Sequence, residues 1–580
     1  MLQDPDLISL QEVRTKVEKA WAAAQRFRAF TQEQVDAVVE RMAEAARGHA
    51  ERLAQMAVEE TGYGNAKDKL AKNMLAAERL PNELRGMKTV GVLRERADEK
   101  ITEIAVPVGV VAAILPTTNP TSTAIYKTLI ALKAGNAIVL SPHPRAKGCT
   151  CATAEVLYRA AVSAGAPEGI IQCLTQPTME ATNELMRHPR TALILSTGGA
   201  GIVKAAYSSG KPAYGVGPGN VPVLLDTTAD VDSAVRGILA GKSFDNGTLC
   251  SSEQTLVAET QIRQNVLNAL TANGAFLCNP AQAAALAKVL FTRGTTVNPE
   301  MVGHAATVIA AKAGFEVPPQ TRVLAAEIQG IGKDHPLSAE KLSPVLALHF
   351  VENFDAALNA CEAVLRFHGL GHTCGIYTTD DAKARQYAMR MPAYRVLANT
   401  PTPQGSVGIT TGLFPAMTLG CGAVAGNATG DNITPLHLVN IKRLAWAIRP
   451  WSNSEVTPVM TQSTGPVSQA RIASAVDRYL SGAQPGQSAN IANIVDKFLE
   501  SKGIMQACEP CAAPKRSPEM ALEKAPEPTK AAVTDFVCED DVRRAIRNNN
   551  KIFIGAKTII TPSARELANA QRDEILVMTK

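Results

Sequence analysis

An α/β fold with parallel sheets is the fold class that the sequence predicts, and three observations lead to it. Short apolar stretches with strand character alternate with helical stretches from about residue 106 onward, a rhythm typical of a parallel sheet covered on both faces. Aromatic residues make up only 4% of the chain while 41 residues are glycine, so backbones can approach each other closely. The 580 residues suffice for three or four domains of about 100–200 residues, or for fewer large ones.

Composition and charge exclude several other classes of protein. Hydrophobic residues make up 46% of the chain and charged residues 19%, which excludes collagen-like, coiled-coil and wholly disordered chains. The net charge of +5, from 59 basic and 54 acidic residues, requires no nucleic-acid partner. No apolar run approaches the ~18–20 residues that span a bilayer, and the polar N-terminus lacks the apolar core of a signal peptide. We therefore expect a cytoplasmic protein with no membrane partner.

Helices are expected to dominate the first part of the chain. Between about residues 12 and 60, apolar positions recur at spacings of three and four, as they do in an amphipathic helix. Gly62 and Gly64 form a stop signal, and a second helical stretch runs to about residue 84. Residues 89–105 mix short apolar pieces with charges, which favours a β-hairpin.

The alternation that follows predicts the elements of a first parallel sheet. Strands are expected at residues 106–115, 137–140, 170–174 and 191–195, and helices at residues 121–134, 153–163 and 180–187. The pattern resumes at Val223, with longer helices and insertions, and continues to about Asn399.

The chain changes character after Trp451. Segments 467–480 and 490–501 each carry a narrow apolar stripe at helical spacing. Residues 507–530 hold five prolines among charges and alanines, which is the composition of a linker. Residues 535–580 contain a helix-like piece, a strand-like piece and a second helix-like piece. We therefore expect a flexible tail that ends in a small module.

Two segments carry candidate chemistry. Among eleven cysteines, Cys250 lies in a polar stretch of Asn, Gly, Thr and Ser, where a thiol is accessible and its pKa can be lowered by nearby dipoles; a structural thiol is the alternative. Residues 196–201 follow a predicted strand and precede a helix, so their amides can face a pyrophosphate; a tight turn is the alternative. Cys508 and Cys511 have no second pair nearby, so no metal site is predicted.

Nine segments, in order, resemble one protein family. They are PTTNPT (116–121), LKAGNAIVLSPHP (132–144), STGGAG (196–201), YGVGPGNVPV (214–223), DNGTLCSSEQ (245–254), EKLSPVLA (340–347), GLGHTCGIYT (369–378), RVLANTPTPQGSVG (395–408) and TLGCGAVAGN (418–427). Together they resemble the aldehyde dehydrogenase superfamily, and within it the CoA-acylating branch of acetaldehyde and propionaldehyde dehydrogenases. The resemblance covers about residues 10–450. Each motif alone is weak, but the ordered combination is highly specific.

The resemblance implies an aldehyde dehydrogenase-like fold of two Rossmann-type α/β domains, a small oligomerisation arm and a C-terminal extension. The NAD-binding domain would span residues 1–225, completed by residues 411–450, with the arm near residues 88–106. The catalytic domain would span residues 226–410. A flexible tail (451–534) and a small module of unknown role (535–580) would follow. A homo-oligomer, either a dimer or a tetramer, is expected.

The resemblance also assigns roles to individual residues. Cys250 matches the nucleophile whose thiolate attacks the aldehyde carbonyl. Asn119 matches the amide that stabilises the resulting oxyanion with the Cys250 backbone N–H, although from the sequence alone a turn residue is the simpler interpretation. Glu340 matches the carboxylate that holds the nicotinamide ribose, although a surface helix cap is its simpler interpretation. The residues expected near the NAD cofactor are Ser196, Thr197, Gly198, Gly199, Ser141 and Pro142.

Departures from the hydrolytic relatives favour coenzyme A as the acyl acceptor. Those relatives carry a general-base glutamate where this chain has Val216. Without that base water attacks the acyl-enzyme slowly, whereas a thiol with a pKa of about 8.5 is partly ionised at neutral pH. Residues 141–144 replace a Lys-Pro motif near the adenosine ribose, so NADP is not excluded. His368 and His372 are candidates for the acceptor path, with packing or turn roles as the alternative.

The sequence therefore predicts an enzyme that converts a short aliphatic aldehyde, propionaldehyde or acetaldehyde, with CoA and NAD⁺ to acyl-CoA and NADH. The amphipathic tail resembles the encapsulation peptides of bacterial microcompartment enzymes, so shell or cargo proteins are expected partners; packing on its own enzyme is the alternative. Two other functions stay open. One is reduction of an acyl-phosphate on the same fold, and the other is a catalytically silent shell-organising protein.

Overall fold

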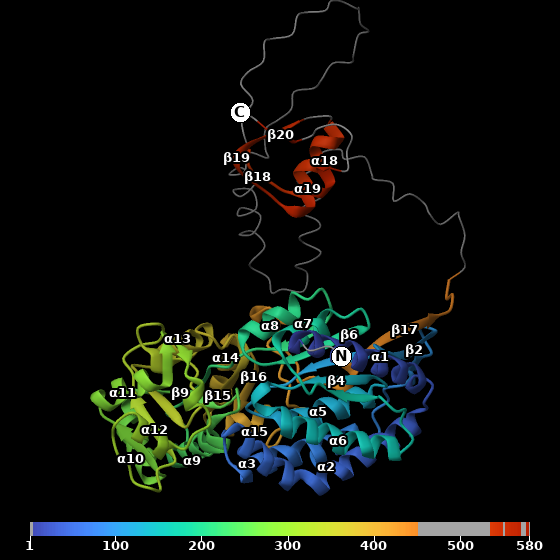
Figure 1. Cartoon of the computed structure of the whole chain (residues 1–580). Helices are drawn as coiled ribbons and strands as arrows, with labels where there is room; N and C mark the ends of the chain where they lie inside the picture. Colours follow the sequence, from blue (N-terminus) through green and yellow to red (C-terminus); the bar gives the residue numbers. More distant parts are fainter. Residues whose placement is uncertain (1–3, 450–533, 549–550, 570–575, 579–580) are drawn as a thin grey trace, which may run out of the picture. The chain divides into compact units, whose positions relative to one another are not determined.

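The computed structural model describes residues 4–449, 534–548, 551–569 and 576–578. The chain divides into two compact units, Met1–Trp451 and Ser452–Lys580. In the first unit, helices cover two parallel sheets (Figure 1), which confirms the predicted fold class. The predicted amphipathic segments 467–480 and 490–501 lie outside the described residues.

The N-terminal helices have clear start and stop signals. A capping box between Thr31 and Gln34 begins the second helix, and Gly62, with a φ of 70°, ends it. The predicted helical stretch 12–60 is two helices because the chain breaks at residues 28–31. The elements are α1 (Pro5–Phe27), α2 (Gln32–Thr61), α3 (Ala66–Met74), the π-helical turn η1 (Leu75–Arg79) and α4 (Leu80–Leu84).

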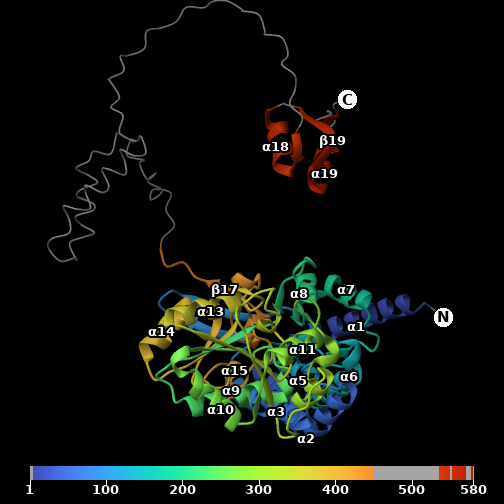
Figure 2. The same cartoon turned by 90° about the vertical axis from the view of Figure 1, so that its left-hand side faces the viewer.

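The first sheet is parallel, with the strand order β5-β4-β3-β6-β7. Helices α5 and α6 cover one face and α1, α7 and α8 the other (Figure 1), and α2 packs outside α6 (Figures 1 and 2). Its strands are β3 (Val110–Ile114), β4 (Ala137–Ser141), β5 (Ile171–Cys173), β6 (Thr191–Thr197) and β7 (Ala213–Val216). Its helices are α5 (Pro120–Lys133), α6 (Lys147–Ser163), α7 (Met179–Arg187) and α8 (Ala200–Tyr207).

The predicted strand 106–115 is wrong as a single element. β2 (Ile101–Pro107) ends before β3 begins at Val110, and each strand belongs to a different sheet. Gly109 lies between them with a φ of 126°, a conformation that residues with a Cβ rarely adopt. This glycine lets the chain pass from one sheet to the next.

An antiparallel sheet contains the expected hairpin. β1 (Gly91–Arg96) pairs with β2, which confirms the hairpin predicted in residues 89–105. On the other side of β2 lies β17 (Val439–Ala445), with Val439 opposite Pro107. The returning segment also contributes Leu419, Ile433 and Leu438 to the apolar core of the first sheet.

The second sheet is also parallel, with the strand order β10-β13-β14-β9-β8-β15-β16. Its strands are β8 (Val221–Leu225), β9 (Glu253–Glu259), β10 (Ala275–Cys278), β13 (Val323–Glu327), β14 (Val345–Val351), β15 (Gly371–Tyr377) and β16 (Ala393–Ala398). The helices around it are α9 (Val231–Ser243), α10 (Arg263–Ala272), α11 (Pro280–Leu290), α12 (Ala306–Lys312), α13 (Phe354–Arg366), α14 (Asp381–Arg390) and α15 (Thr402–Ser406).

Short elements complete the first unit. A two-stranded ribbon joins β11 (Phe291–Arg293) to β12 (Thr296–Val297). The 3₁₀ turns are η2 (Pro144–Ala146), η3 (Phe244–Gly247), η4 (Thr260–Ile262), η5 (Pro299–Met301), η6 (Pro336–Ser338), η7 (Ala423–Ala425) and η8 (Pro435–Leu438).

The second unit contains a small α/β module. Its parallel sheet has the order β18-β19-β20, and Val537, Val542, Ile554 and Ala564 form its core. The predicted helix, strand and helix are all present. The elements are β18 (Thr534–Val537), α18 (Glu539–Asn548), β19 (Ile552–Ile560), α19 (Pro562–Asn569) and β20 (Leu576–Met578).

Candidate active site

The carboxyl edge of the first sheet gathers one group of predicted site residues. Ile114, the last residue of β3, lies beside Ser141 of β4 and Ser196 of β6. The loops that leave these strands carry Asn119, Pro142 and residues 197–199. In open parallel sheets, ligands bind outside this edge.

The amino edge of the second sheet gathers the other group. Cys250 precedes β9, Glu340 precedes β14, and His372 is the second residue of β15. Register places Val221 of β8 beside Glu253 of β9. Residues more than 100 positions apart in the sequence therefore meet at one end of this sheet.

Cys250 and His372 form a hydrogen-bonded pair. The Cys250 Sγ lies 3.1 Å from His372 Nε2, and His372 Nδ1 lies 2.9 Å from Thr373 Oγ1. At Gly219 a Cβ would lie 2.2 Å from the Cys250 carbonyl oxygen and 3.1 Å from the His372 ring, so only glycine fits there. The thiol is placed to pass its proton to the imidazole.

Arg395 binds the backbone of His372 through a hydrogen bond to its carbonyl oxygen. This guanidinium is only 3% exposed and donates to the carbonyl oxygens of His372 at 2.6 Å, Gly420 at 2.5 Å and Gly430 at 2.8 Å. A buried charge needs such partners. One side chain thus ties β15 to the returning segment beside the cysteine and histidine.

Burial is the largest cause of the pKa shifts of both Cys250 and His372. It raises the pKa of Cys250 to about 12, helped by the Glu340 charge. Burial also lowers the pKa of His372 well below its usual value, helped by Arg395. Both groups are therefore neutral at neutral pH. The expectation of a lowered thiol pKa is wrong, because the protein excludes the water that would solvate a thiolate.

We expect alkylation of Cys250 by iodoacetamide to accelerate almost tenfold per pH unit between about pH 7 and pH 9, without levelling off. Only the thiolate reacts, and its fraction rises throughout this range because the thiol pKa lies far above it. Glu340 ionises near pH 8, and its charge makes the rise slightly less than tenfold. Peptide mass spectrometry measures the rate at Cys250. A plateau below pH 8 would instead reveal a resting thiolate–imidazolium pair.

Glu340 is buried, so its interpretation as a surface helix cap is wrong. It is 7% exposed, and its Oε1 accepts the Gly219 backbone N–H at 3.2 Å. Burial raises the pKa of Glu340 to about 8. Its role in holding the nicotinamide ribose stays a prediction.

Asn119 stands at the N-cap position of α5 and is 8% exposed. Its Oδ1 accepts a hydrogen bond from Lys72 Nζ at 2.6 Å, and its Nδ2 donates to Thr118 Oγ1 at 3.0 Å. Its role at the oxyanion also stays a prediction.

The predicted cofactor segment offers free hydroxyl groups. Ser196 Oγ and Thr197 Oγ1 are buried and have no hydrogen-bond partner within the described part of the chain. Gly199 is the N-cap residue of α8 and follows Gly198. By contrast, the Ser141 hydroxyl has a partner, because its Oγ lies 3.0 Å from Thr182 Oγ1. Pro142, the next residue, is buried.

The structure separates the two histidine candidates. His368 is exposed, and its ring stacks on Phe367 with 4.5 Å between centroids, whereas His372 contacts Cys250. Sequence reasoning missed Arg395 and Lys72 altogether. Arg395 opens the family motif RVLANTPTPQGSVG, which was its one available signal, and Lys72 had none.

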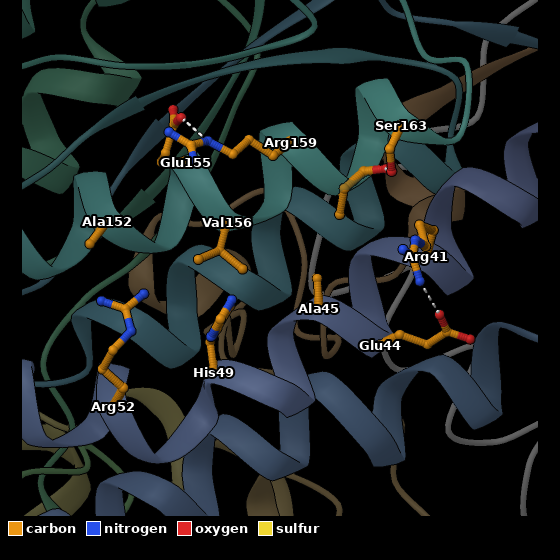
Figure 3. A pocket seen from close by; sticks show the side chains of 11 residues that line it. Arg41, Glu44, Ala45, His49, Arg52, Ala152, Glu155, Val156, Arg159 and Ser163 are labelled. Atoms are coloured by element: carbon orange, nitrogen blue, oxygen red, sulfur yellow. Dashed lines mark hydrogen bonds and ion pairs between the residues drawn. The ribbon is translucent and has the colours of Figure 1, made fainter.

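A separate hollow of about 670 Å³ lies between α2 and α6 (Figure 3). Its walls include Arg41, Glu44, Glu155 and Arg159, and the dashed lines in Figure 3 mark the ion pairs Arg41–Glu44 and Arg159–Glu155. The predicted site residues do not line it. Two of its arginines are thus already paired with glutamates, and we assign no site to this hollow.

Across residues 4–449 and the described parts of 534–578, no three His, Cys, Asp or Glu side chains are grouped so that they could hold a metal ion. Within the same residues, none of the helices has the length and apolar character needed to cross a bilayer.

Comparison with known proteins identifies the family. A family model described as the aldehyde dehydrogenase family matches residues 4–278. The acetylating succinate-semialdehyde dehydrogenase of Clostridium kluyveri is 36% identical over 439 residues, which cover 76% of this chain and 96% of that protein. The chain belongs to the aldehyde dehydrogenase family. The family predicted from the nine motifs is thereby confirmed.

Two solved structures of aldehyde dehydrogenases resemble this chain. An acetylating aldehyde dehydrogenase from Geobacillus thermoglucosidasius is 48% identical, with a TM-score of 0.77 over 78% of this chain and 100% of that one. A propionaldehyde dehydrogenase from the Clostridium phytofermentans fucose utilisation bacterial microcompartment is 29% identical, with a TM-score of 0.70 over 75% and 97%.

Longer relatives match over only part of their length. The bifunctional aldehyde-alcohol dehydrogenase AdhE of Escherichia coli K12 is 42% identical over 442 residues, which are 75% of this chain and 50% of that protein. The chain thus spans about half the length of such relatives.

Proposed function

We propose that this aldehyde dehydrogenase is a CoA-acylating enzyme that oxidises a short aliphatic aldehyde with NAD, through a thioester on Cys250. The observation that carries the proposal is the 3.1 Å contact between Cys250 Sγ and His372 Nε2. The absence of a carboxylate at Val216, a side chain only 2% exposed at the end of β7, supports a thiol rather than water as the acceptor.

The chain fits a dinucleotide at the carboxyl edge of the first sheet. The buried hydroxyls of Ser196 and Thr197 lack partners among the described residues, and the N-terminal N–H groups of α8 follow them. Phosphate groups suit this combination of donors. When bound, NAD supplies the hydride acceptor, and these residues would hold its phosphates.

The protein groups can move the protons that the reaction requires. His372 is neutral and accepts the proton of Cys250 as the sulfur attacks the aldehyde carbonyl. The oxygen then gains negative charge, which the Asn119 amide and the Cys250 backbone N–H would stabilise. The resulting imidazolium, whose pKa is lowered by burial, releases this proton to solvent. After acylation the neutral His372 is then placed to take the proton of the incoming CoA thiol. Val216 offers no base that could activate water instead.

Propionaldehyde or acetaldehyde is the proposed substrate, and a bacterial microcompartment the proposed location. The name of one similar structure, a propionaldehyde dehydrogenase from a bacterial microcompartment, supports both the substrate and the location. Segment 490–501 is the first candidate for the targeting peptide and segment 467–480 the second. Fusion of residues 485–504 to a fluorescent reporter in cells that make shells tests the location, and diffuse fluorescence would reject that segment.

We also propose that the enzyme is a homo-oligomer that associates through the antiparallel sheet. β17 is an edge strand, with Ile441 43% and Leu444 47% exposed, and Trp446 beyond it is 64% exposed. Exposed apolar edge strands favour pairing with another chain. Light scattering measures the mass in solution, and a mass of 61.4 kDa would contradict the proposal.

CoA should be required for continuous NADH formation from propionaldehyde and NAD. Without CoA we expect a burst of about one NADH per active site, because the acyl group stays on Cys250. Rapid-mixing absorbance measures both phases, with NADP tested in parallel. Equal rates with and without CoA would indicate hydrolysis. If no NADH forms but an acyl-phosphate is reduced, the alternative reductase is correct, and no activity at all would favour the shell-organising role.

A further inference from the structure

A buried cluster of charged and polar side chains lies between α3 and the loop that carries Cys250. We call it the lysine cluster. Its members are each at most 8% exposed, and they come from segments far apart in the sequence. They are Lys69, Lys72, Asn119, Asp245 and Thr248.

Lys72 lies at the centre of the lysine cluster. Its Nζ donates to Asp245 Oδ2, to Asn119 Oδ1 at 2.6 Å and, at 3.5 Å, to Thr248 Oγ1. Thr248 Oγ1 in turn donates to Asp245 Oδ2 at 2.6 Å. One ammonium group therefore contacts both the asparagine predicted to stabilise the oxyanion and the segment that ends at Cys250.

Asp245 is held in an unusual backbone conformation. Its φ is 47°, and that of Asn246 is 52°, a region that residues other than glycine occupy at a cost. Its Oδ1 accepts the Asn65 backbone N–H at 2.8 Å, and its own N–H donates to Asp68 at 2.7 Å. Such strain persists only where the surroundings fix it, so the position of this carboxylate is well defined.

The chemistry of Lys72 decides the orientation of Asn119. A lysine ammonium has three donors and no acceptor, so the asparagine must turn its oxygen toward Lys72. The Nδ2 group has two N–H donors: one donates to Thr118 Oγ1 at 3.0 Å, and the other is left for the reacting oxygen. An amide turned the other way would present its own oxygen to the oxyanion and repel it.

Charge strengthens this arrangement. Burial lowers the pKa of Lys72 to about 8, although Asp245 opposes the shift, so the ammonium is still mostly protonated at pH 7. Burial alone would raise the pKa of Asp245, but Lys72 and Lys69 outweigh it and hold that pKa below its usual value. Hydrogen bonds from charged donors are shorter and stronger than neutral ones.

We propose that Lys72 is a positioning residue that orients the Asn119 amide for oxyanion stabilisation and fixes its distance from the Cys250 loop. The inference rests on the proposed function, because it requires a reaction with an oxyanion. Lys69 donates to the same carboxylate at 3.1 Å and to the Thr118 carbonyl at 3.0 Å, whereas among the described residues it is Lys72 that donates to the Asn119 side chain.

A double-mutant cycle tests the proposal. Lys72→Met should lower kcat by about 10²-fold, comparable with the loss of one oxyanion donor, and leave the KM for aldehyde nearly unchanged. Because Lys72 acts through Asn119, the double variant with Asn119→Ala should be no slower than Asn119→Ala alone. Lys69→Met is the matched control, since it removes an equally buried lysine that binds the same carboxylate, and a smaller loss of kcat is expected.

Additive losses in the double variant would overturn the proposal, as would a Lys72→Met enzyme within about twofold of the wild-type kcat. If Lys72→Met does not fold, Lys72→Gln takes its place, because its amide N–H can still donate to Asn119. The kcat of Lys72→Gln should be higher than that of Asn119→Ala. A Lys72→Gln enzyme as slow as Asn119→Ala would contradict the inference. Failure of the proposed function would appear differently, as a wild-type enzyme without CoA-dependent NADH formation.

Discussion

Replacement of Cys250 by alanine should abolish CoA-dependent NADH formation, with kcat lowered by at least about 10⁴-fold. The variant has no sulfur at residue 250 to attack the aldehyde carbonyl and to carry the acyl group as a thioester. Steady-state absorbance measures the rate. A second readout is the mass of the intact wild-type protein, which should gain one acyl group on Cys250 when aldehyde and NAD are supplied without CoA.

Cys278→Ala is the matched control for this variant. Burial raises the pKa of Cys278 to about 12 as well, but this thiol lies at the end of β10, where its Sγ donates to the Phe276 carbonyl oxygen at 3.9 Å rather than to a histidine. The control should keep wild-type kcat. If Cys250→Ala retained activity, or if the acyl group were found on another cysteine, Cys250 would not be the nucleophile.

Replacement of His372 by alanine should lower kcat by about 10²–10⁴-fold, the range expected for loss of a general base. The thiol would keep a high pKa while losing the group 3.1 Å away that accepts its proton. The NADH burst without CoA and the CoA-dependent steady state should both slow, because the same imidazole serves both thiols. Rapid-mixing measurement of the two phases separates these steps.

His368→Ala distinguishes between the two histidines that the sequence offers. His368 is exposed and stacks on a phenylalanine, whereas the ring that contacts Cys250 is that of His372, so loss of His368 should change kcat less than about threefold. A large loss in His368→Ala combined with a small one in His372→Ala would reverse the assignment. Equal losses would indicate that the loop between them, rather than one ring, governs the rate.

Most of the helices and strands could be predicted because local patterns of apolar and polar residues determine them. The helix 180–187 and the strand 191–195 were expected within two residues of α7 and β6, since short apolar strands between helices leave few alternatives. The error at residues 106–115 arose because both strands flanking Gly109 are apolar. A φ of 126° at that glycine is a property of the folded backbone and leaves no mark on the periodicity.

The site was only partly predictable, because its geometry depends on long-range contacts. The polar setting of Cys250 indicated reactivity, yet the expected direction of its pKa shift was wrong, because the thiol is buried among residues distant in the sequence, such as His372 and Cys421. Lys72 appeared as one more charge on an amphipathic helix. Its proposed role depends on contacts with Asp245 and Asn119, which are 173 and 47 positions away in the sequence.

The contacts of Arg395 have a consequence for the order in which the protein matures during synthesis. Its guanidinium binds the His372 carbonyl on one side and the Gly420 and Gly430 carbonyls on the other. The ribosome makes the N-terminal part first, so a nascent chain that stops short of Gly420 has the cysteine and the histidine but lacks two of the carbonyls that accept hydrogen bonds from this buried guanidinium. We therefore expect the cysteine–histidine pair to be completed late, when the strands and helices around it have already formed. Until then the Cys250 thiol has neither the burial that raises its pKa nor the imidazole that accepts its proton at 3.1 Å.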